Sequence, residues 1–496
     1  MAKQRLSPLL VGLSGLALGG SLGESWAWPL AWVGLVPLWW VTERRDAWKW
    51  GMLWGAAYHG AALSWLVHLH PLTWLGIPWS LSLVIALAIW LFVTLWGAVG
   101  VGLWAGLTSR VIQPWVRLWV GLALWCGGET LATRTCLWWS TLALTQSPGN
   151  PTFLHLGQLS GPVTPVAWLL LVNGVLALAI RYPLPIVLPL ALGLFGLGHS
   201  LGWFLQVTAP PEGFLASLTV GIVQPNIPNP VRFTSQGQAQ MLERLQAGYT
   251  TLAQRGADMV LTPEGALGGE FSPNHALVGL VQRWRIPLVL GAYGRRQGRL
   301  TNSLFVLDGH GQVVGRYDKV KIVPLGEFIP GERWLGPWVR RISALPESQT
   351  PGPLSQSVQT RMSPVIAGIC YDSAFAPVFR EQARRGGEWI LTAANNDPYP
   401  PRMMRQHQAQ DVLRAIETDR WLARATNTGI SGVISPRGRI VWQAPPRTNV
   451  VHLARIYRRT HLTPYVRYGD WLTPLLLGIS GLSWCMDGRL AQPRNG

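Results

Sequence analysis

Apolar and polar residues are unevenly distributed along the 496-residue chain, and this pattern divides it into three regions. Residues 1–208 are almost continuously apolar, residues 215–458 alternate between short apolar runs and polar stretches, and residues 469–496 begin with another apolar run. A helix that crosses a membrane needs about 20 mostly apolar residues. This criterion predicts eight membrane-spanning helices, at residues 8–24, 25–42, 51–69, 78–107, 115–131, 161–180, 183–206 and 469–486. We therefore expect a seven-helix membrane domain over 1–208, a soluble domain over 215–458, and a last helix with its tail over 469–496.

The Lys and Arg residues of the short loops predict how these helices are oriented, because such residues concentrate on the cytoplasmic side. With eight spans, ten of them fall on one side: Lys3, Arg5, Arg44, Arg45, Lys49, Arg110, Arg117, Arg181, Arg489 and Arg494. The opposite short loops carry only Arg134. Both termini are therefore expected in the cytoplasm, and the soluble domain is expected on the far side of the membrane.

Within residues 215–458, apolar runs bounded by turn residues alternate with stretches of helical spacing. The predicted strands are LTVGIVQPNI, ADMVLTPEGAL, IPLVLGAY, TNSLFVLDG, VIAGICYD and EWILTAANND. The predicted helices are QGQAQMLERLQAGYTTLAQRG and RMMRQHQAQDVLRAIETDRWLARA, and NTGISGVISPRGRIVWQ is a predicted hairpin. Buried strands that alternate with helices are typical of an α/β domain.

The composition agrees with a membrane protein, since only 13% of the residues are charged, against about 25% in ordinary globular domains. The net charge of +18 can indicate nucleic-acid binding, but it also fits cytoplasmic loops and attraction to anionic lipid. We expect no nucleic-acid partner. The cysteines Cys126, Cys136, Cys370 and Cys485 are widely spaced, without a CxxC or Cys/His cluster, so we expect neither a disulfide framework nor a metal site.

Three predicted strands of the soluble domain end in groups that can do chemistry. Glu264 follows an apolar strand in VLTPEGAL, Lys319 lies in GRYDKVKIVPLGEFIP, and Cys370 ends the run VIAGIC. Catalytic groups of α/β sheets commonly project from the loops beyond strand ends. A carboxylate can take the proton of a thiol, a thiolate can attack a carbonyl carbon, and an ammonium can stabilise the resulting oxyanion. Together the three groups suffice for acyl transfer through a thioester.

Taken singly, each of these residues has a commoner structural interpretation. A lone cysteine at a strand end is more often buried packing, a glutamate after proline is more often a turn residue, and a lysine is usually solvated. His407 reads as a helix-surface histidine or one whose hydrogen bonds are satisfied in the fold. The order Glu, Lys, Cys with these flanking residues is much more specific.

The soluble domain resembles the nitrilase, or carbon–nitrogen hydrolase, superfamily, whose catalytic triad is Glu, Lys and Cys. The segments YDKVKIVPLGEFIP and ARATNTGISGVISPRGRI, together with the flanking spans, resemble the bacterial apolipoprotein N-acyltransferases in particular, over essentially the whole chain. The resemblance implies an αββα sandwich. It also implies that Glu264 is the general base, Lys319 the oxyanion stabiliser and Cys370 the nucleophile, with Lys321 as a less favoured lysine.

The resemblance further implies supporting roles for three residues. Glu327 matches a second glutamate that holds the lysine, Asn302 matches an asparagine that lines the site, and the backbone N–H of Tyr371 would complete the oxyanion hole. The chain departs from the family pattern at Thr262, where Trp is usual, and at Asp372, where Glu is usual. A third departure is the segment NNDPYPPR (395–402), which replaces an aromatic-rich loop expected to shape substrate binding.

What the resemblance implies about function is acyl transfer without a cofactor. A phospholipid would donate the acyl chain, and the N-terminal diacylglyceryl-cysteine of an apolipoprotein would accept it. The enzyme would be a monomer in the bacterial cytoplasmic (inner) membrane, with its catalytic domain on the periplasmic side. Two alternatives are a membrane-tethered amidase of nitrilase type that hydrolyses a small amide, and a catalytically silent scaffold or transporter-like protein. The few charges in the spans, Glu129 chief among them, weigh against a transporter.

Overall fold

The computed structural model describes residues 8–182, 185–213, 215–332, 334 and 347–490, which form two compact units. Unit 1 takes its residues from 1–67, 83–208 and 468–496, and unit 2 takes its residues from 68–82 and 209–467. Lys3, Arg5 and Arg494, on which the predicted orientation partly depends, lie outside the described residues. Segment 68–82 comes from the apolar half of the chain but belongs to unit 2, where Trp74 stacks on Phe233 with ring centroids 5.5 Å apart.

The described part of unit 1 consists of helices joined by turns. Its α-helices are α1 (Pro8–Ser21), α2 (Val36–Val41), α3 (Ala47–Ala62), α4 (Trp79–Thr108, of which residues 79–82 belong to unit 2), α5 (Pro114–Ala132), α6 (Pro151–Leu154), α7 (Gly157–Ser160), α8 (Val163–Arg181), α9 (Val187–Thr208) and α17 (Leu472–Leu490). Helix α8 packs against α2, α5 and α9 and is largely buried. Its Asn173 donates to the carbonyl of Ala31 and accepts from the N–H of Leu35, which satisfies a buried amide inside an apolar bundle.

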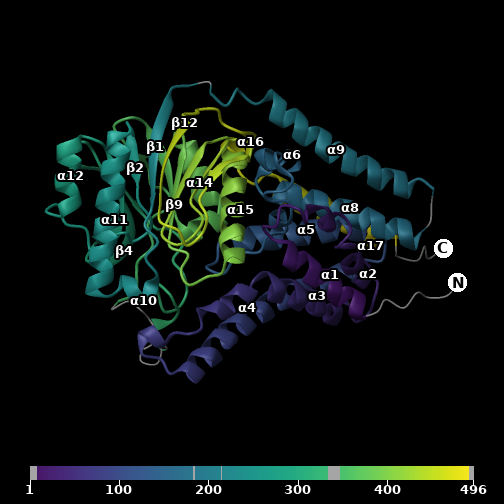
Figure 1. Ribbon diagram of the computed structural model, residues 1–496. Helices are drawn as coiled ribbons and strands as arrows, with labels where there is room; N and C mark the ends of the chain where they lie inside the picture. The colour runs from purple at the N-terminus through teal and green to yellow at the C-terminus, as the bar shows by residue number, and fades with distance from the viewer. Residues whose placement is uncertain (1–7, 183–184, 214, 333, 335–346, 491–496) are drawn as a thin grey trace, which may run out of the picture. The chain divides into compact units, whose positions relative to one another are not determined.

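Three described helices of unit 1, α4, α8 and α9, are long and apolar enough to cross a membrane (Figure 1). Shorter apolar helical stretches lie at Pro8–Ser21, Trp28–Val41 and Leu472–Cys485. The range 25–42 contains a 3₁₀ helix at Trp28–Trp32 and then α2, each with a proline in its first turn, where proline is tolerated. The structure thus supports an apolar helical unit with three candidate spans, and the eight-span domain stays a prediction.

The described part of unit 2 contains two six-stranded sheets. The first has the order β12-β1-β2-β3-β4-β5, with β1 (Ser217–Gln224), β2 (Met259–Leu261), β3 (Leu288–Arg296), β4 (Arg299–Leu307), β5 (Val313–Asp318) and β12 (Val450–Tyr457). The second has the order β11-β10-β9-β8-β7-β6, with β6 (Val358–Gln359), β7 (Pro364–Ile369), β8 (Ile390–Ala394), β9 (Leu422–Thr426), β10 (Gly432–Ile434) and β11 (Ile440–Gln443). The central pairs β1–β2, β2–β3, β7–β8 and β8–β9 are parallel, and the outer pairs are antiparallel.

The two sheets pack face to face, in contact at β1 and β9, and helices cover their outer faces (Figure 1). Helices α11 (Ser235–Gln254) and α12 (Ala276–Trp284) pack on the first sheet, where Leu245, Val260 and Leu288 share one buried core. Helices α14 (Ala376–Arg384) and α15 (Pro401–Thr418) pack on the second sheet, and the short helices α10 (Asn229–Arg232) and α16 (Pro464–Tyr468) also belong to this unit. This arrangement confirms the predicted α/β fold, with layers in the order helix, sheet, sheet, helix.

One predicted element was partly wrong. The helix expected to run from Arg402 to Ala425 ends at Thr418, and residues Leu422–Thr426 form the buried strand β9. Asp419 adopts a left-handed conformation with φ of +56° and stops the helix. The helical spacing of apolar residues continues past Thr418 in the sequence, but pairing with β8 makes residues Leu422–Thr426 a strand.

Candidate active site

The three residues singled out by the sequence all lie just beyond the C-terminal ends of strands in unit 2. Glu264 is three residues past β2, Lys319 follows β5 directly, and Cys370 follows β7 directly. Strand β5 runs in the same direction as β2, because β2 is parallel to β3 and two antiparallel steps lead from β3 to β5. Glu264 and Lys319 therefore project from one edge of the first sheet.

Lys319 lies between two carboxylates. Its ammonium donates to Oε1 of Glu264 over 3.0 Å and to Oε1 of Glu327 over 2.6 Å, and its side chain is only 1% exposed. Glu327 is itself held by the backbone N–H of Val323 on Oε2, at 2.7 Å. The structure thus brings Glu264, Lys319 and Glu327 together. Because the ammonium is removed from water, the two carboxylates must compensate its charge.

Two asparagines complete the hydrogen bonding of these carboxylates. Asn302, on β4, donates its Nδ2 to Glu264 over 2.8 Å and to Glu327 over 3.2 Å. The backbone N–H of Asn395, just beyond β8, donates to Oε2 of Glu264 over 2.8 Å. The sequence pointed to Asn302 but not to Asn395, since that bond joins the two sheets and leaves no local signature.

The electrostatics of the two glutamates differ because their partners differ. Burial alone would raise the pKa of Glu264, but the charge of Lys319 and the donors Lys319, Asn395 and Asn302 outweigh it and hold that pKa below its ordinary value. Burial raises the pKa of Glu327, helped by the neighbouring charge of Glu264 and opposed by Lys319. The pKa of Lys319 is raised because the charges of the two glutamates outweigh its burial. Of the two carboxylates, Glu264 is therefore the one whose ionised form is more strongly favoured.

Cys370 follows β7 directly and is the first residue of the 3₁₀ helix Cys370–Ala374, which forms a tight turn. Its φ of +50° is unusual for a residue with a side chain and costs on the order of 1–3 kcal/mol. Asp372 holds this turn by accepting from the N–H of Ile369 at 3.0 Å, the N–H of Lys321 at 2.8 Å and the hydroxyl of Tyr317 at 2.9 Å. The aspartate that replaces the usual glutamate thus fastens the cysteine turn to the lysine segment.

The surroundings of Cys370 favour the protonated thiol over the thiolate. Burial is the main cause that raises its pKa, the negative charge of Glu264 raises it further, and the charge of Lys319 lowers it. The charges of the glutamate and the lysine therefore act on the pKa of this thiol in opposite directions. A thiol of this kind becomes a nucleophile when a base removes its proton during attack.

The contacts of Lys321 and Lys319 distinguish the two lysines that the sequence offered for the site. The Lys321 ammonium lies over the Phe375 ring, 4.3 Å from its centroid, whereas Lys319 contacts both glutamates. Tyr371 packs edge-on against the same Phe375, with ring centroids 5.0 Å apart.

Among the described residues, no group of three or more His, Cys, Asp or Glu side chains could hold a metal ion.

His407 was expected on a helix surface or satisfied in the fold, and the structure shows the second. It is fully buried on α15, and its Nε2 lies 2.8 Å from the carbonyl oxygen of Cys370. Nearly the whole length of α15 is buried, including polar residues such as Gln406 and Gln410. A polar helix without an apolar stripe is typical of the protein surface, so no sequence pattern indicates this contact.

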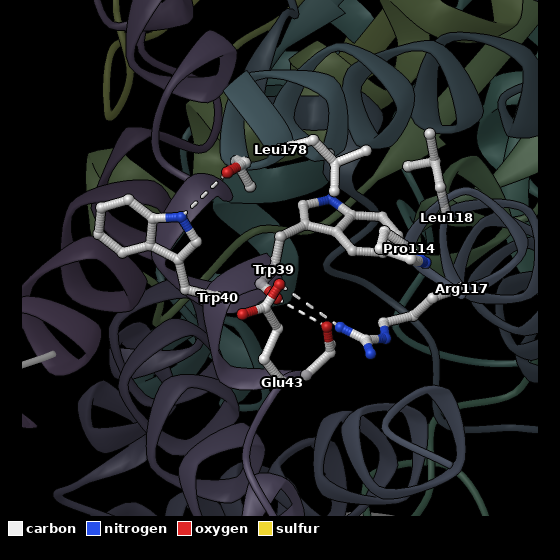
Figure 2. Close-up of a pocket in the computed structure, with 10 residues that line it drawn as sticks. Trp39, Trp40, Glu43, Pro114, Arg117, Leu118 and Leu178 are labelled. Atoms are coloured by element: carbon white, nitrogen blue, oxygen red, sulfur yellow. Dashed lines mark hydrogen bonds and ion pairs between the residues drawn. The ribbon is translucent and has the colours of Figure 1, made fainter. Parts of the chain in front are cut away.

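A separate pocket lies in unit 1 (Figure 2). Trp39, Trp40, Glu43 and Arg117 are among its lining residues, and Glu43 pairs with Arg117 over 3.5 Å. Figure 2 shows the Glu43 carboxylate directed toward the Arg117 guanidinium. None of the residues at the strand ends of unit 2 lines this pocket.

Comparison with known proteins links both parts of the chain to one family. The carbon-nitrogen hydrolase profile matches residues 219–465, and the apolipoprotein N-acyltransferase N-terminal domain profile matches residues 14–175. An apolipoprotein N-acyltransferase of Nostoc sp. is 43% identical over 93% of this chain and 95% of its own length. One from Synechocystis sp. is 40% identical over 92% of this chain and 96% of its own length. A solved amidase from Nesterenkonia sp. AN1 is 17% identical, with a TM-score of 0.39 over 52% of this chain and 96% of that one.

Proposed function

Because this chain belongs to the apolipoprotein N-acyltransferase family, we propose that it moves an acyl chain from a phospholipid to an apolipoprotein. The acceptor is the α-amino group of an N-terminal diacylglyceryl-cysteine, and the acyl chain passes through a thioester on Cys370. The observation that carries the proposal is the buried Lys319 ammonium shared by Glu264 and Glu327 beside the strained cysteine turn.

In the first half-reaction, Glu264 takes the proton from the sulfur of Cys370, and the sulfur attacks the carbonyl carbon of a phospholipid ester. The carbonyl oxygen becomes an oxyanion, which the Lys319 ammonium and the N–H of Tyr371 stabilise. The bond from that carbon to the glycerol oxygen then breaks, and Glu264 returns the proton to that oxygen. A lysophospholipid leaves, and the acyl chain remains on the sulfur.

In the second half-reaction, the amine of the acceptor attacks the thioester carbon. Glu264 takes a proton from the attacking nitrogen, the same donors hold the second oxyanion, and the carbon–sulfur bond breaks. The proton passes from Glu264 to the departing sulfur, which restores the thiol. Glu327 and Asn302 keep the lysine and the base in place through both steps, since both contact Glu264 or Lys319 directly.

The apolar helices of unit 1 are consistent with substrates that reside in a membrane. Both are lipids, and α4, α8 and α9 have the length and composition to cross a membrane. Exposed apolar side chains on two of these helices suit contact with lipid tails: Leu91, Phe92, Leu95, Trp96, Leu192, Trp203 and Phe204. We place the enzyme in the bacterial inner membrane as a monomer, with the catalytic unit on the periplasmic side and the termini in the cytoplasm.

A transfer assay tests this function against hydrolysis of a small amide, for which the same three groups would suffice. The detergent-solubilised protein is incubated with phospholipid carrying a labelled acyl chain and with a synthetic diacylglyceryl-cysteine peptide. We expect label in the peptide amide, loss of transfer in Cys370→Ser, and full transfer in Cys136→Ser, which changes an exposed cysteine of unit 1. Release of ammonia from small amides without transfer to the peptide would favour the amidase instead.

A further inference from the structure

The carbonyl oxygen of Cys370 is hydrogen-bonded by a residue of α15, a helix that packs on the second sheet. His407, on α15, lies with its Nε2 2.8 Å from this oxygen, and the imidazole is fully buried. The carbonyl belongs to the peptide group that joins Cys370 to Tyr371, and the N–H of Tyr371 is the other end of that group. A peptide group is planar, so a bond that fixes its carbonyl also fixes the direction of its N–H.

A row of buried hydrogen bonds determines which nitrogen of His407 carries the proton. Arg424 donates to the carboxylate of Asp411 over 2.7 Å and to Oδ1 of Asn396 over 3.3 Å. Arginine has no acceptor, so Asn396 must present its oxygen to Arg424 and its NH₂ group to Nδ1 of His407, 2.9 Å away. The Nδ1 atom therefore accepts, and Nε2 carries the hydrogen that is donated to Cys370.

We propose that His407 is a positioning residue that orients the N–H of Tyr371 as an oxyanion-hole donor, by holding the carbonyl of the same peptide group. This inference rests on the proposed thioester mechanism. The donated hydrogen bond also polarises the peptide, so that its N–H becomes a stronger donor. Asp411, Arg424 and Asn396 serve the same end by fixing the histidine tautomer.

The charge state of His407 agrees with this role. Burial is the main cause that holds its pKa well below the ordinary value, and the charge of Arg424 lowers it further. The imidazole is thus neutral and adds no second positive charge beside the Cys370 turn. Cys370 has a φ of +50°, and a strained turn of this kind persists only when its surroundings fix it. The hydrogen bond from His407 to the Cys370 carbonyl is one contact that fixes this turn.

A pair of near-isosteric variants separates this role from simple packing. His407→Gln keeps an N–H donor near the place of Nε2, and His407→Met fills similar space without a donor. The two reactions compared are acylation of Cys370 by p-nitrophenyl butyrate, which passes through an oxyanion, and alkylation by iodoacetamide, which does not. We expect His407→Met to slow acylation by roughly 10- to 100-fold while alkylation stays within about twofold. His407→Gln should recover most of the acylation rate.

Gln382→Leu is the matched control. Gln382 is buried on α14 and both donates to and accepts from the backbone of Ala367, which lies on β7 three residues before Cys370. Its loss should lower stability and leave the ratio of acylation to alkylation unchanged. If His407→Met fails to fold, Asn396→Leu removes the partner of Nδ1 and should lower the same ratio.

Equal losses of acylation and alkylation in His407→Met, or unchanged acylation, would overturn the inference. Because p-nitrophenyl butyrate is not a phospholipid, the test of His407 does not depend on whether phospholipid is the acyl donor. A protein that is acylated by the ester but never by phospholipid would refute the phospholipid donor, while the ratio in the histidine variants would still decide the role of His407.

Discussion

The ammonium of Lys319 donates to the carboxylate of Glu264 across 3.0 Å, in a place where the lysine is almost completely removed from solvent. The two residues are 55 positions apart in the sequence and reach one another because β2 and β5 end at the same edge of the sheet. Removing one member of such a buried pair leaves an uncompensated charge, which is far more costly than the loss of an exposed ion pair.

Lys319→Met should therefore abolish acylation of Cys370 and destabilise unit 2. We expect the acylation rate to fall by at least about 100-fold, because the oxyanion loses a charged donor. The free energy of unfolding should fall by about 3–5 kcal/mol, since Glu264 and Glu327 then face one another without the cation. Stopped-flow acylation and thermal unfolding in detergent measure the two effects.

Lys321→Met is the control for this change. Lys321 lies two residues further on, and its ammonium rests over the Phe375 ring rather than between carboxylates. Its replacement should leave the acylation rate within about threefold, as expected for loss of a cation–π contact of about 1 kcal/mol or less. Equal losses in the two variants would contradict the assignment of the oxyanion stabiliser to Lys319.

Asn302→Leu should shift the pH dependence of acylation. Glu264 must be ionised to accept the thiol proton, and its pKa lies below the ordinary value of 4.5, so the acid limb of the wild-type rate lies below that pH. Asn302 donates to Glu264 and so favours the ionised form. Without it the pKa of Glu264 rises, and the rate is lost at a higher pH as the solution is acidified. Acylation rates between pH 4 and pH 8 measure the shift, and an unmoved or lowered acid limb would argue against Glu264 as the base.

Asp372 should make the stability of unit 2 depend on pH. Burial raises the pKa of Asp372 from its ordinary value of 3.8 to about 6 in the folded state. Between these values the unfolded chain releases a proton that the folded chain keeps, so stability falls as the pH rises from about 4 to 6 and is then constant. The difference corresponds to about 3 kcal/mol at most.

The comparison of wild type with Asp372→Asn isolates this contribution, because the other titrating groups are common to both proteins. The unfolding free energy of the wild type, relative to the variant, should decline between pH 4 and pH 6. A relative stability that is constant or rises over this range would show that the hydrogen bonds from Ile369, Lys321 and Tyr317 outweigh the burial of the carboxylate.

Much of unit 2 could be predicted from the sequence because its central strands, such as β7 and β8, are buried along almost their whole length. The runs that became β1, β7 and β8 are short, apolar and bounded by polar loops, so both the strands and the reactive groups at their ends stand out. What joins those ends is not local. The bond from the N–H of Asn395 to Glu264 depends on how two sheets stack, and no sequence pattern records it.

Two other features show where sequence patterns fail. Helix α15 is polar but buried, with Arg414 bonded to Glu417 and His407 bonded to the cysteine turn. The sequence pattern predicted a helix here and left both a surface and a buried position open for His407. In the helical unit, hydropathy alone predicted one span over residues 25–42, although the structure has a 3₁₀ helix followed by α2. Average apolarity does not report where the backbone changes direction.

The most direct test of the account is mass spectrometry of the full-length protein after incubation with phospholipid in the absence of an acceptor. The account predicts one added acyl chain, on the peptide that contains Cys370, removable by hydroxylamine and transferred on addition of the diacylglyceryl-cysteine peptide. Cys370→Ala should carry no adduct. An acyl thioester trapped on that variant, or transfer to the acceptor without any adduct on the wild-type sulfur, would contradict it.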